Sequence, residues 1–254
     1  MSRLTLHLLG TPQIVLDGES VSGFVTRKAQ ALLIYLANTG AVHTRDRLAG
    51  LFWPDRPDKS AKNNLRRTLP NLRKLVGSHL AIDTQTISLA PETDYWLDVD
   101  AFTDVFSTSV GPKAMMTMPL EELATKTKLY QGEFLQGFYV PALPEFEQWV
   151  LMEREHLRAL AIRALVVLAD RYRQVGDVDS GLATTRRLLE LEPWYEAAHQ
   201  QQMLLLARSG RRGAALAQYR TYCALMANEF GAEPSLEMRS YYERIKAGEL
   251  DIMD

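Results

Sequence analysis

The chain has 254 residues, enough for one large or two ordinary domains with a sizeable buried core. With 46% hydrophobic and 24% charged residues, it is not a disordered or low-complexity protein. A single cysteine, Cys223, excludes an internal disulfide, and five scattered histidines show no metal-ligand spacing, so no metal or other cofactor is expected. No apolar run reaches roughly 18 residues and no signal peptide is evident, so we expect a cytoplasmic protein without membrane contact.

Charge is distributed unevenly along the chain. The formal net charge is −2, yet residues 27–74 carry eleven Lys/Arg against three acids. The next stretch, residues 75–105, has six acids and no Lys or Arg. A basic block on an otherwise acidic chain predicts a polyanion-binding surface confined to one part of the molecule.

The first elements predicted are short strands followed by helices. Residues 4–22 alternate as strands around an Asp17-Gly18 turn. From Arg27 to Ala37 the apolar spacing becomes helical and Gly40 ends the run. A second helix is expected over Arg45–Phe52, capped by Thr44, and a third begins near Asp58 or Ser60.

The third helix is amphipathic in a way that suggests nucleic-acid recognition. On a wheel of about 100° per residue, one side is apolar and contains Ala61, Leu65, Leu69, Leu72 and Val76. The opposite side contains Lys59, Asn63, Arg66, Arg67, Arg73 and Lys74, with no acid among them. Asn and Arg make bidentate contacts to base edges, and the other cations suit phosphates, so this face is predicted to enter a DNA major groove. Pro70 removes one hydrogen bond and is expected to kink the helix. A solvated helix face is the simpler alternative.

A closing hairpin completes the N-terminal pattern. Leu80–Ile82 and Ile87–Leu89 flank a turn at residues 83–86, and a further strand is expected at Tyr95–Leu97. Strands, three helices and a hairpin predict a winged helix-turn-helix, with residues 1–106 as its domain. The expected turn carries no Arg or Lys, so insertion of a cation into the minor groove is not predicted.

The second half is predicted to be all helical. Residues 107–118 lack a clear period and form the expected joint, and residues 119–250 the expected second domain. Helices are expected over 120–130 and about 145–175, separated by a loop. Four residue identities then recur 34 residues apart, from Gly176/Gly210 to Arg186/Arg220, the period of tetratricopeptide (TPR) helix pairs. An ordinary helical bundle is the alternative. The fold class predicted is therefore mainly α with a small β component: a winged helix followed by a TPR-like helical domain.

Two sets of segments resemble a known family. The stretches at 27–33, 47–54 (Arg-Leu-Ala-Gly-Leu-Phe-Trp-Pro) and 63–73 (Asn-Asn-Leu-Arg-Arg-Thr-Leu-Pro-Asn-Leu-Arg) resemble the winged helix of SARP-type bacterial activators. Those at 129–135 and 144–157 resemble the bacterial transcriptional activator domain that accompanies it. Larger family members continue into a further module, so this chain is expected to be either a compact member or the front part of a longer protein.

The resemblance implies a transcription factor that binds promoter direct repeats as a homodimer and recruits RNA polymerase holoenzyme through contacts that include its sigma factor. Base readout then falls to Asn63, Arg66 and Arg67. The expected phosphate contacts are Arg27, Lys28, Thr44, Arg45, Lys59, Lys62, Arg73 and Lys74.

Two other functions are compatible with some of the residues. A TPR-like adaptor could use its winged helix for protein contacts alone, without reading bases. An enzyme would need catalytic residues, but the acid pairs Glu153/Glu155 and Asp177/Asp179 are expected on helix surfaces or in helix-loop contexts, with no nucleophile motif such as Gly-x-Ser-x-Gly. No catalytic residue is therefore predicted.

Overall fold

The computed structural model describes residues 2–107 and 114–249. The chain packs as two compact units, and each is described by itself. The first contains the elements up to helix α4 together with Lys128–Leu157, and the second contains helices α5 and α6 and the chain from Arg158 onward. Most of the joint expected at 107–118 lies outside the described residues, so the division into domains there stays a prediction.

A four-stranded sheet opens the first unit. Its order is β3-β2-β1-β7, with β1 at Arg3–His7, β2 at Gln13–Leu16, β3 at Glu19–Ser20 and β7 at Asp94–Leu97. Strand β1 pairs antiparallel with β2, as the alternating pattern predicts, and it buries Leu4 and Leu6 completely. Strand β7 pairs parallel with β1, a long-range pairing that no local pattern indicated.

Three helices follow, and the second has the predicted Thr44 cap. Helix α1 (Arg27–Thr39) is capped by the Thr26 side chain and α2 (Arg45–Phe52) by Thr44, each accepting from a backbone N–H in the first turn. Helix α3 (Asp58–Val76) continues through Pro70, and the five apolar residues of the predicted stripe are all buried. The predicted extents of α1 to α3 are therefore confirmed to within a few residues.

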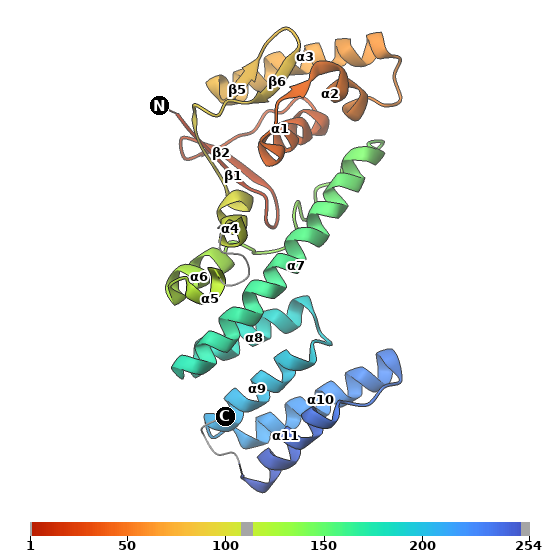
Figure 1. The fold of residues 1–254 in the computed structure, drawn as a ribbon. Helices are drawn as coiled ribbons and strands as arrows, with labels where there is room; N and C mark the ends of the chain where they lie inside the picture. Colours follow the sequence, from red (N-terminus) through yellow and green to blue (C-terminus); the bar gives the residue numbers. More distant parts are fainter. Residues whose placement is uncertain (1, 108–113, 250–254) are drawn as a thin grey trace. The chain divides into compact units, whose positions relative to one another are not determined.

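A second sheet forms the wing. It has the order β4-β6-β5, with β4 at His43–Thr44, β5 at Leu80–Ile82 and β6 at Thr86–Leu89, and a 3-10 turn at Gly77–His79 precedes β5. The β5–β6 hairpin is the one predicted, and it lies beside α3 in Figure 1. The predicted winged helix-turn-helix is therefore confirmed.

The segment Lys128–Leu157 packs on this winged helix, although it follows the expected joint in sequence. Leu135 donates its backbone N–H to the carbonyl of Leu8 at 2.8 Å, and Leu9 bridges to Phe134. Arg154 of α7 (Pro144–Val175) donates to the carbonyls of Phe134 (2.7 Å) and Leu135 (2.9 Å). These bonds attach the loop to the end of strand β1.

An aromatic cluster joins α1 and α2 to the start of α7. Tyr35 lies edge-on to Trp149 with ring centroids 4.9 Å apart, and Phe52 lies 5.7 Å from Phe146. Such pairs contribute about 0.5–1.5 kcal/mol each beyond the area they bury. The first two turns of α7 are thus part of one core with α1 and α2.

The second unit consists of helices. They are α5 (Ala114–Thr117), α6 (Leu120–Thr127), the end of α7, α8 (Val178–Leu191), α9 (Glu196–Arg208), α10 (Arg212–Phe230) and α11 (Leu236–Ala247). Helices α8, α9, α10 and α11 pack in sequence order, each against the next (Figure 1). Within the described residues, no helix is both long enough and apolar enough to cross a membrane.

The 34-residue period marks equivalent helix ends. Gly176 and Gly210 both have φ of 75°, and each follows the last turn of a helix. Asp177 donates its N–H to Tyr172 at 3.0 Å, and Arg211, 34 residues later, donates to Leu206 at 2.9 Å. These are the bonds of a Schellman ending, which favours glycine because of its left-handed backbone. The repeat therefore reflects structure rather than chance spacing.

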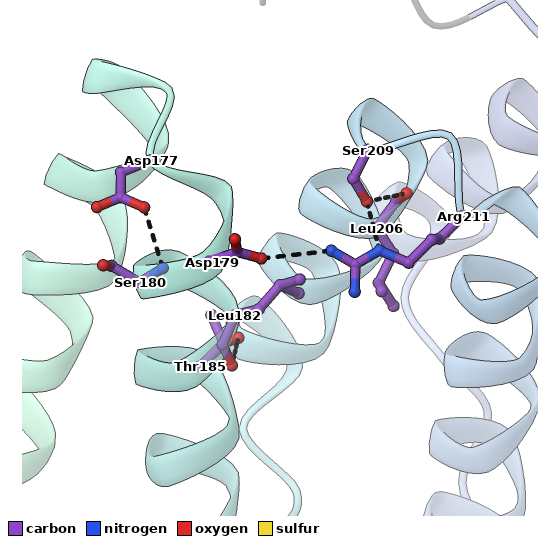
Figure 2. Close-up of polar contacts among 8 residues, drawn as sticks. All are labelled: Asp177, Asp179, Ser180, Leu182, Thr185, Leu206, Ser209 and Arg211. Carbon is purple, nitrogen blue, oxygen red and sulfur yellow. Dashed lines mark hydrogen bonds and ion pairs between the residues drawn. The ribbon is translucent and has the colours of Figure 1, made fainter.

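Figure 2 shows the junction between these two repeats. The Asp177 carboxylate accepts from the Ser180 N–H at 3.1 Å and caps α8. Asp179 lies 3.7 Å from the Arg211 guanidinium, which also donates to the Ser209 hydroxyl at 2.9 Å. The start of α8 is thus tied to the turn that precedes α10.

A buried histidine makes the second unit sensitive to pH. Burial lowers the pKa of His199, although the Pro193 carbonyl and Glu196 oppose the shift. Its ring lies between that carbonyl at 2.7 Å and the Gln218 side chain at 2.7 Å. Because the unfolded chain takes up a proton near the ordinary value of 6.5 and the folded unit does not, stability is present above that pH and decreases as pH falls through it.

We therefore expect His199→Gln to flatten the pH dependence of the second unit between pH 7 and 5. The measurement is the hydrogen-exchange protection of α9 amides in the full chain at each pH. His156→Gln is the matched control, since His156 is exposed on α7. An unchanged pH profile in His199→Gln would contradict the assignment.

Candidate nucleic-acid interface

The outer face of α3 is exposed, and its side chains have no hydrogen-bond or ion-pair partners among the described residues. For six exposed polar residues of this face, the side chain has no such partner: Lys59, Asn63, Arg66, Arg67, Arg73 and Lys74. The buried stripe on the opposite side holds the helix against the core. The first unit therefore presents this face outward, as predicted.

A groove borders α3 on the side of the wing. It has a volume of about 570 Å³ and brings together the start of α2, the first half of α3 and the wing turn. Its lining consists of Thr44, Arg45, Asp46, Lys62, Asn63, Leu65, Arg66, Thr84 and Gln85. The sequence predicted all three cations of this lining, Arg45, Lys62 and Arg66, but not Thr84 or Gln85, because turn residues without charge carry no binding signal by themselves.

A second hollow borders the opposite flank of α3. Its volume is about 390 Å³, and it lies between the start of α1 and the turn joining α2 to α3. Its lining consists of Val25, Thr26, Lys28, Trp53, Asp55, Arg56, Asn64, Arg67 and Thr68. Arg56 and Asn64 were not predicted as site residues; their position one turn from Lys59 and Arg67 is the signal that could have found them.

The wing turn is held rigidly against α2. Asp83 accepts from the N–H groups of Gln85 (2.6 Å) and Thr86 (2.8 Å) and from the Thr86 hydroxyl (2.7 Å). The Thr86 hydroxyl and these N–H groups, with a contribution from Arg45, lower the pKa of Asp83 to about 2. The Gln85 carbonyl accepts from the Arg45 N–H at 2.9 Å. This turn is therefore anionic at neutral pH and fixed beside the groove.

Several predicted phosphate contacts already have partners within the first unit. Lys28 donates its ammonium to the Phe52 carbonyl at 2.8 Å, and burial lowers its pKa. Arg27 donates to the Tyr139 carbonyl at 3.1 Å. Lys62 pairs with Asp46 at 2.8 Å, both side chains being exposed. Lys28 is thus held by the fold, whereas Arg27 and Lys62 remain accessible at the surface.

Arg45 and Thr44 lie where the first groove meets the start of α2. The Thr44 hydroxyl accepts from the Arg47 N–H at 3.2 Å, as expected of a helix cap. The Nε of Arg45 is shielded from solvent and has no hydrogen-bond partner among the described residues. An unsatisfied guanidinium donor beside a helix N-terminus suits an anionic oxygen.

The described residues contain no cluster of His, Cys, Asp and Glu that could hold a metal ion. The first unit presents an exposed helix with cationic and amide side chains between two hollows. This arrangement defines a winged-helix protein whose third helix has an exposed cationic face, followed by TPR-like helix pairs.

Comparison with known proteins identifies the family. Residues 97–246 match the model described as the bacterial transcriptional activator domain, so the chain belongs to that family. Transcriptional regulatory protein MoaR1 of Mycobacterium tuberculosis is 24% identical over 250 residues, covering 94% of this chain and 78% of that protein. Regulatory protein AfsR of Streptomyces coelicolor is 22% identical, covering 95% of this chain and 24% of that protein.

A related regulator also has a solved structure. Transcriptional regulatory protein EmbR of M. tuberculosis is 23% identical, and the match covers 96% of this chain and 63% of EmbR. The structure of EmbR in complex with a low-affinity phosphopeptide matches with a TM-score of 0.70 and 24% identity, covering 99% of this chain and 67% of that one. The fold is therefore shared, and the predicted resemblance to SARP-type regulators is confirmed.

Proposed function

We propose that this protein is a sequence-specific transcriptional activator that binds promoter DNA. It acts in the cytoplasm and catalyses no reaction. The observation that carries the proposal is the exposed, acid-free face of α3 between two hollows. An α-helix with its side chains is about 10–12 Å across, which fits a major groove about 12 Å wide. The names of the relatives support the regulatory role.

Base readout is assigned to three residues on the first half of α3. Asn63 can accept and donate to an adenine edge, and Arg66 and Arg67 can each form two hydrogen bonds with a guanine. None of the three has a partner within the described chain, so binding breaks no existing bond. Arg66 lines the first groove and Arg67 the second hollow, so their side chains diverge toward the two flanks.

Phosphate contacts are assigned to the edges of the two hollows. Thr44, Arg45 and Lys62 line one, and Lys28 and Arg56 line the other. The two strands of a duplex flank its major groove, so a recognition helix needs cations on both sides. Arg27, Lys59, Arg73 and Lys74 extend this set, and together they position the helix without reading sequence.

The helical unit is assigned to protein contacts. Stacked helix pairs with a 34-residue period form surfaces that bind other proteins. We assign two partners to these surfaces. One is a second copy of the chain, which gives a homodimer on direct repeats, and the other is RNA polymerase holoenzyme with its sigma factor. An adaptor that reads no bases is the competing function, and the next experiment separates the two.

Selection of bound duplexes from a random pool at 50 and 200 mM salt tests the proposal. We expect one enriched motif, present as a direct repeat, and affinity that falls about 10³–10⁵-fold between the two salts if 6–10 phosphates are contacted. The control is the Arg66→Ala/Arg67→Ala double variant, which should enrich no motif. If the wild-type chain enriches no motif at low salt, it reads no bases, and the adaptor function is favoured.

A further inference from the structure

One acid lies inside the proposed DNA-binding groove. Of the described residues that line the wing-side groove, Asp46 is the only Asp or Glu, whereas Arg45, Lys62 and Arg66 are cations. The Asp46 side chain is 72% exposed, so burial does not force it into this position. An exposed anion in a surface meant for a polyanion opposes binding, and its presence requires a reason.

The Asp46 carboxylate lies where a DNA phosphate would be expected to bind, beside the Lys62 ammonium and in the first turn of α2. It belongs to the first turn of α2, where the helix N-terminus favours negative charge, and its Oδ2 accepts from the Lys62 ammonium at 2.8 Å. Capping of α2 does not depend on it, because the Thr44 hydroxyl already accepts from the Arg47 N–H. The hydrogen bond that Lys62 donates to Asp46 also raises the pKa of Lys62, so the lysine keeps its charge.

We propose that Asp46 is an internal competitor for DNA phosphate: its carboxylate occupies the Lys62 ammonium and the α2 N-terminus until a backbone phosphate displaces it. The displaced carboxylate stays near the incoming phosphate and repels it. Both effects are independent of base sequence, so Asp46 weakens binding to every duplex alike. Retention on promoter DNA then depends more heavily on the base contacts of α3. This inference rests on the proposed DNA-binding function.

The test is the variant Asp46→Asn, measured by fluorescence anisotropy on the full chain with the selected duplex and with a scrambled duplex. We expect affinity to rise about three- to tenfold at 50 mM salt on both duplexes, with their ratio unchanged. Lys62 contacts a phosphate in both complexes, so the slope of log K against log salt should change by less than the value of about 0.9 expected for one phosphate contact. Because salt screens the repulsion that Asp46 exerts on phosphate, the gain in affinity should be smaller at 200 mM salt than at 50 mM.

Two controls make the result specific. Asp94→Asn removes one exposed, ion-paired acid from the same unit, beside Arg3 and outside the groove, and should change affinity less than twofold. In a Lys62→Ala background the gain from Asp46→Asn should fall below its wild-type value, since only the repulsion is relieved. Thermal unfolding of each variant checks that the fold is retained.

The outcomes separate this inference from the proposed function. If the wild-type chain shows no salt-dependent binding to either duplex, the proposed function fails. If it binds but Asp46→Asn behaves like Asp94→Asn, the competitor role is wrong. A change confined to the selected duplex would also overturn it, because that result means that Asp46 contacts a base.

Discussion

Replacing Arg66 by Ala is expected to weaken binding to the selected duplex about 5- to 150-fold, or about 1–3 kcal/mol, and to relax preference at one base pair. The reason is that Arg66 is exposed, lines the wing-side groove and has no partner within the described residues, so its guanidinium is free to form two bonds to a guanine. The measurement is affinity for a panel of duplexes, each with one substituted base pair.

Lys74→Ala is the matched contrast. Lys74 lies on the same face of the same helix, two turns further on, and is also exposed. As a phosphate contact it should weaken all duplexes equally and reduce the salt slope by about one. If Arg66→Ala and Lys74→Ala weaken every duplex by the same factor, Arg66 does not read bases.

Replacing Asp98 by Ala is expected to lower the free energy of unfolding of the first unit by about 2–6 kcal/mol. The Asp98 carboxylate is 3% exposed and accepts from the N–H groups of Leu8 (2.8 and 2.9 Å) and Leu9 (2.9 Å). Alanine leaves both donors buried without an acceptor, which costs about 1–3 kcal/mol each. Urea unfolding, followed by exchange of the Leu8 and Leu9 amides, measures the loss.

The variant Asp98→Asn separates hydrogen bonding from charge. Burial raises the pKa of Asp98, and the N–H bonds from Leu9 and Leu8 oppose the rise, so the ionised form is costly but well bonded. Asparagine keeps one acceptor oxygen and avoids the buried charge, so its loss should be about half that of alanine. Equal losses for the two variants would mean that the carboxylate charge, not the acceptor geometry, stabilises the end of β1.

The local elements and the exposed cationic face of α3 were predictable because each depends on residues close in sequence. The apolar stripe of α3 places Asn63 and Arg66 outward whatever the helix packs against. Thr44 caps α2 by accepting a hydrogen bond from Arg47, only three positions later in the sequence. The 34-residue recurrence of Gly176 and Gly210 likewise reflects a local helix ending. Periodicity and capping are properties of short segments, so the sequence by itself determined them.

Only the tertiary structure decided which predicted cations are free. The bonds from Lys28 to the Phe52 carbonyl and from Lys62 to Asp46 join residues 24 and 16 positions apart, and no periodic pattern encodes them. The attachment of the Phe134 loop to β1 spans more than a hundred residues. Such contacts depend on how helices and strands pack against one another. For that reason the sequence determined which helix faces outward, and the packed structure determined what its neighbours leave available for binding.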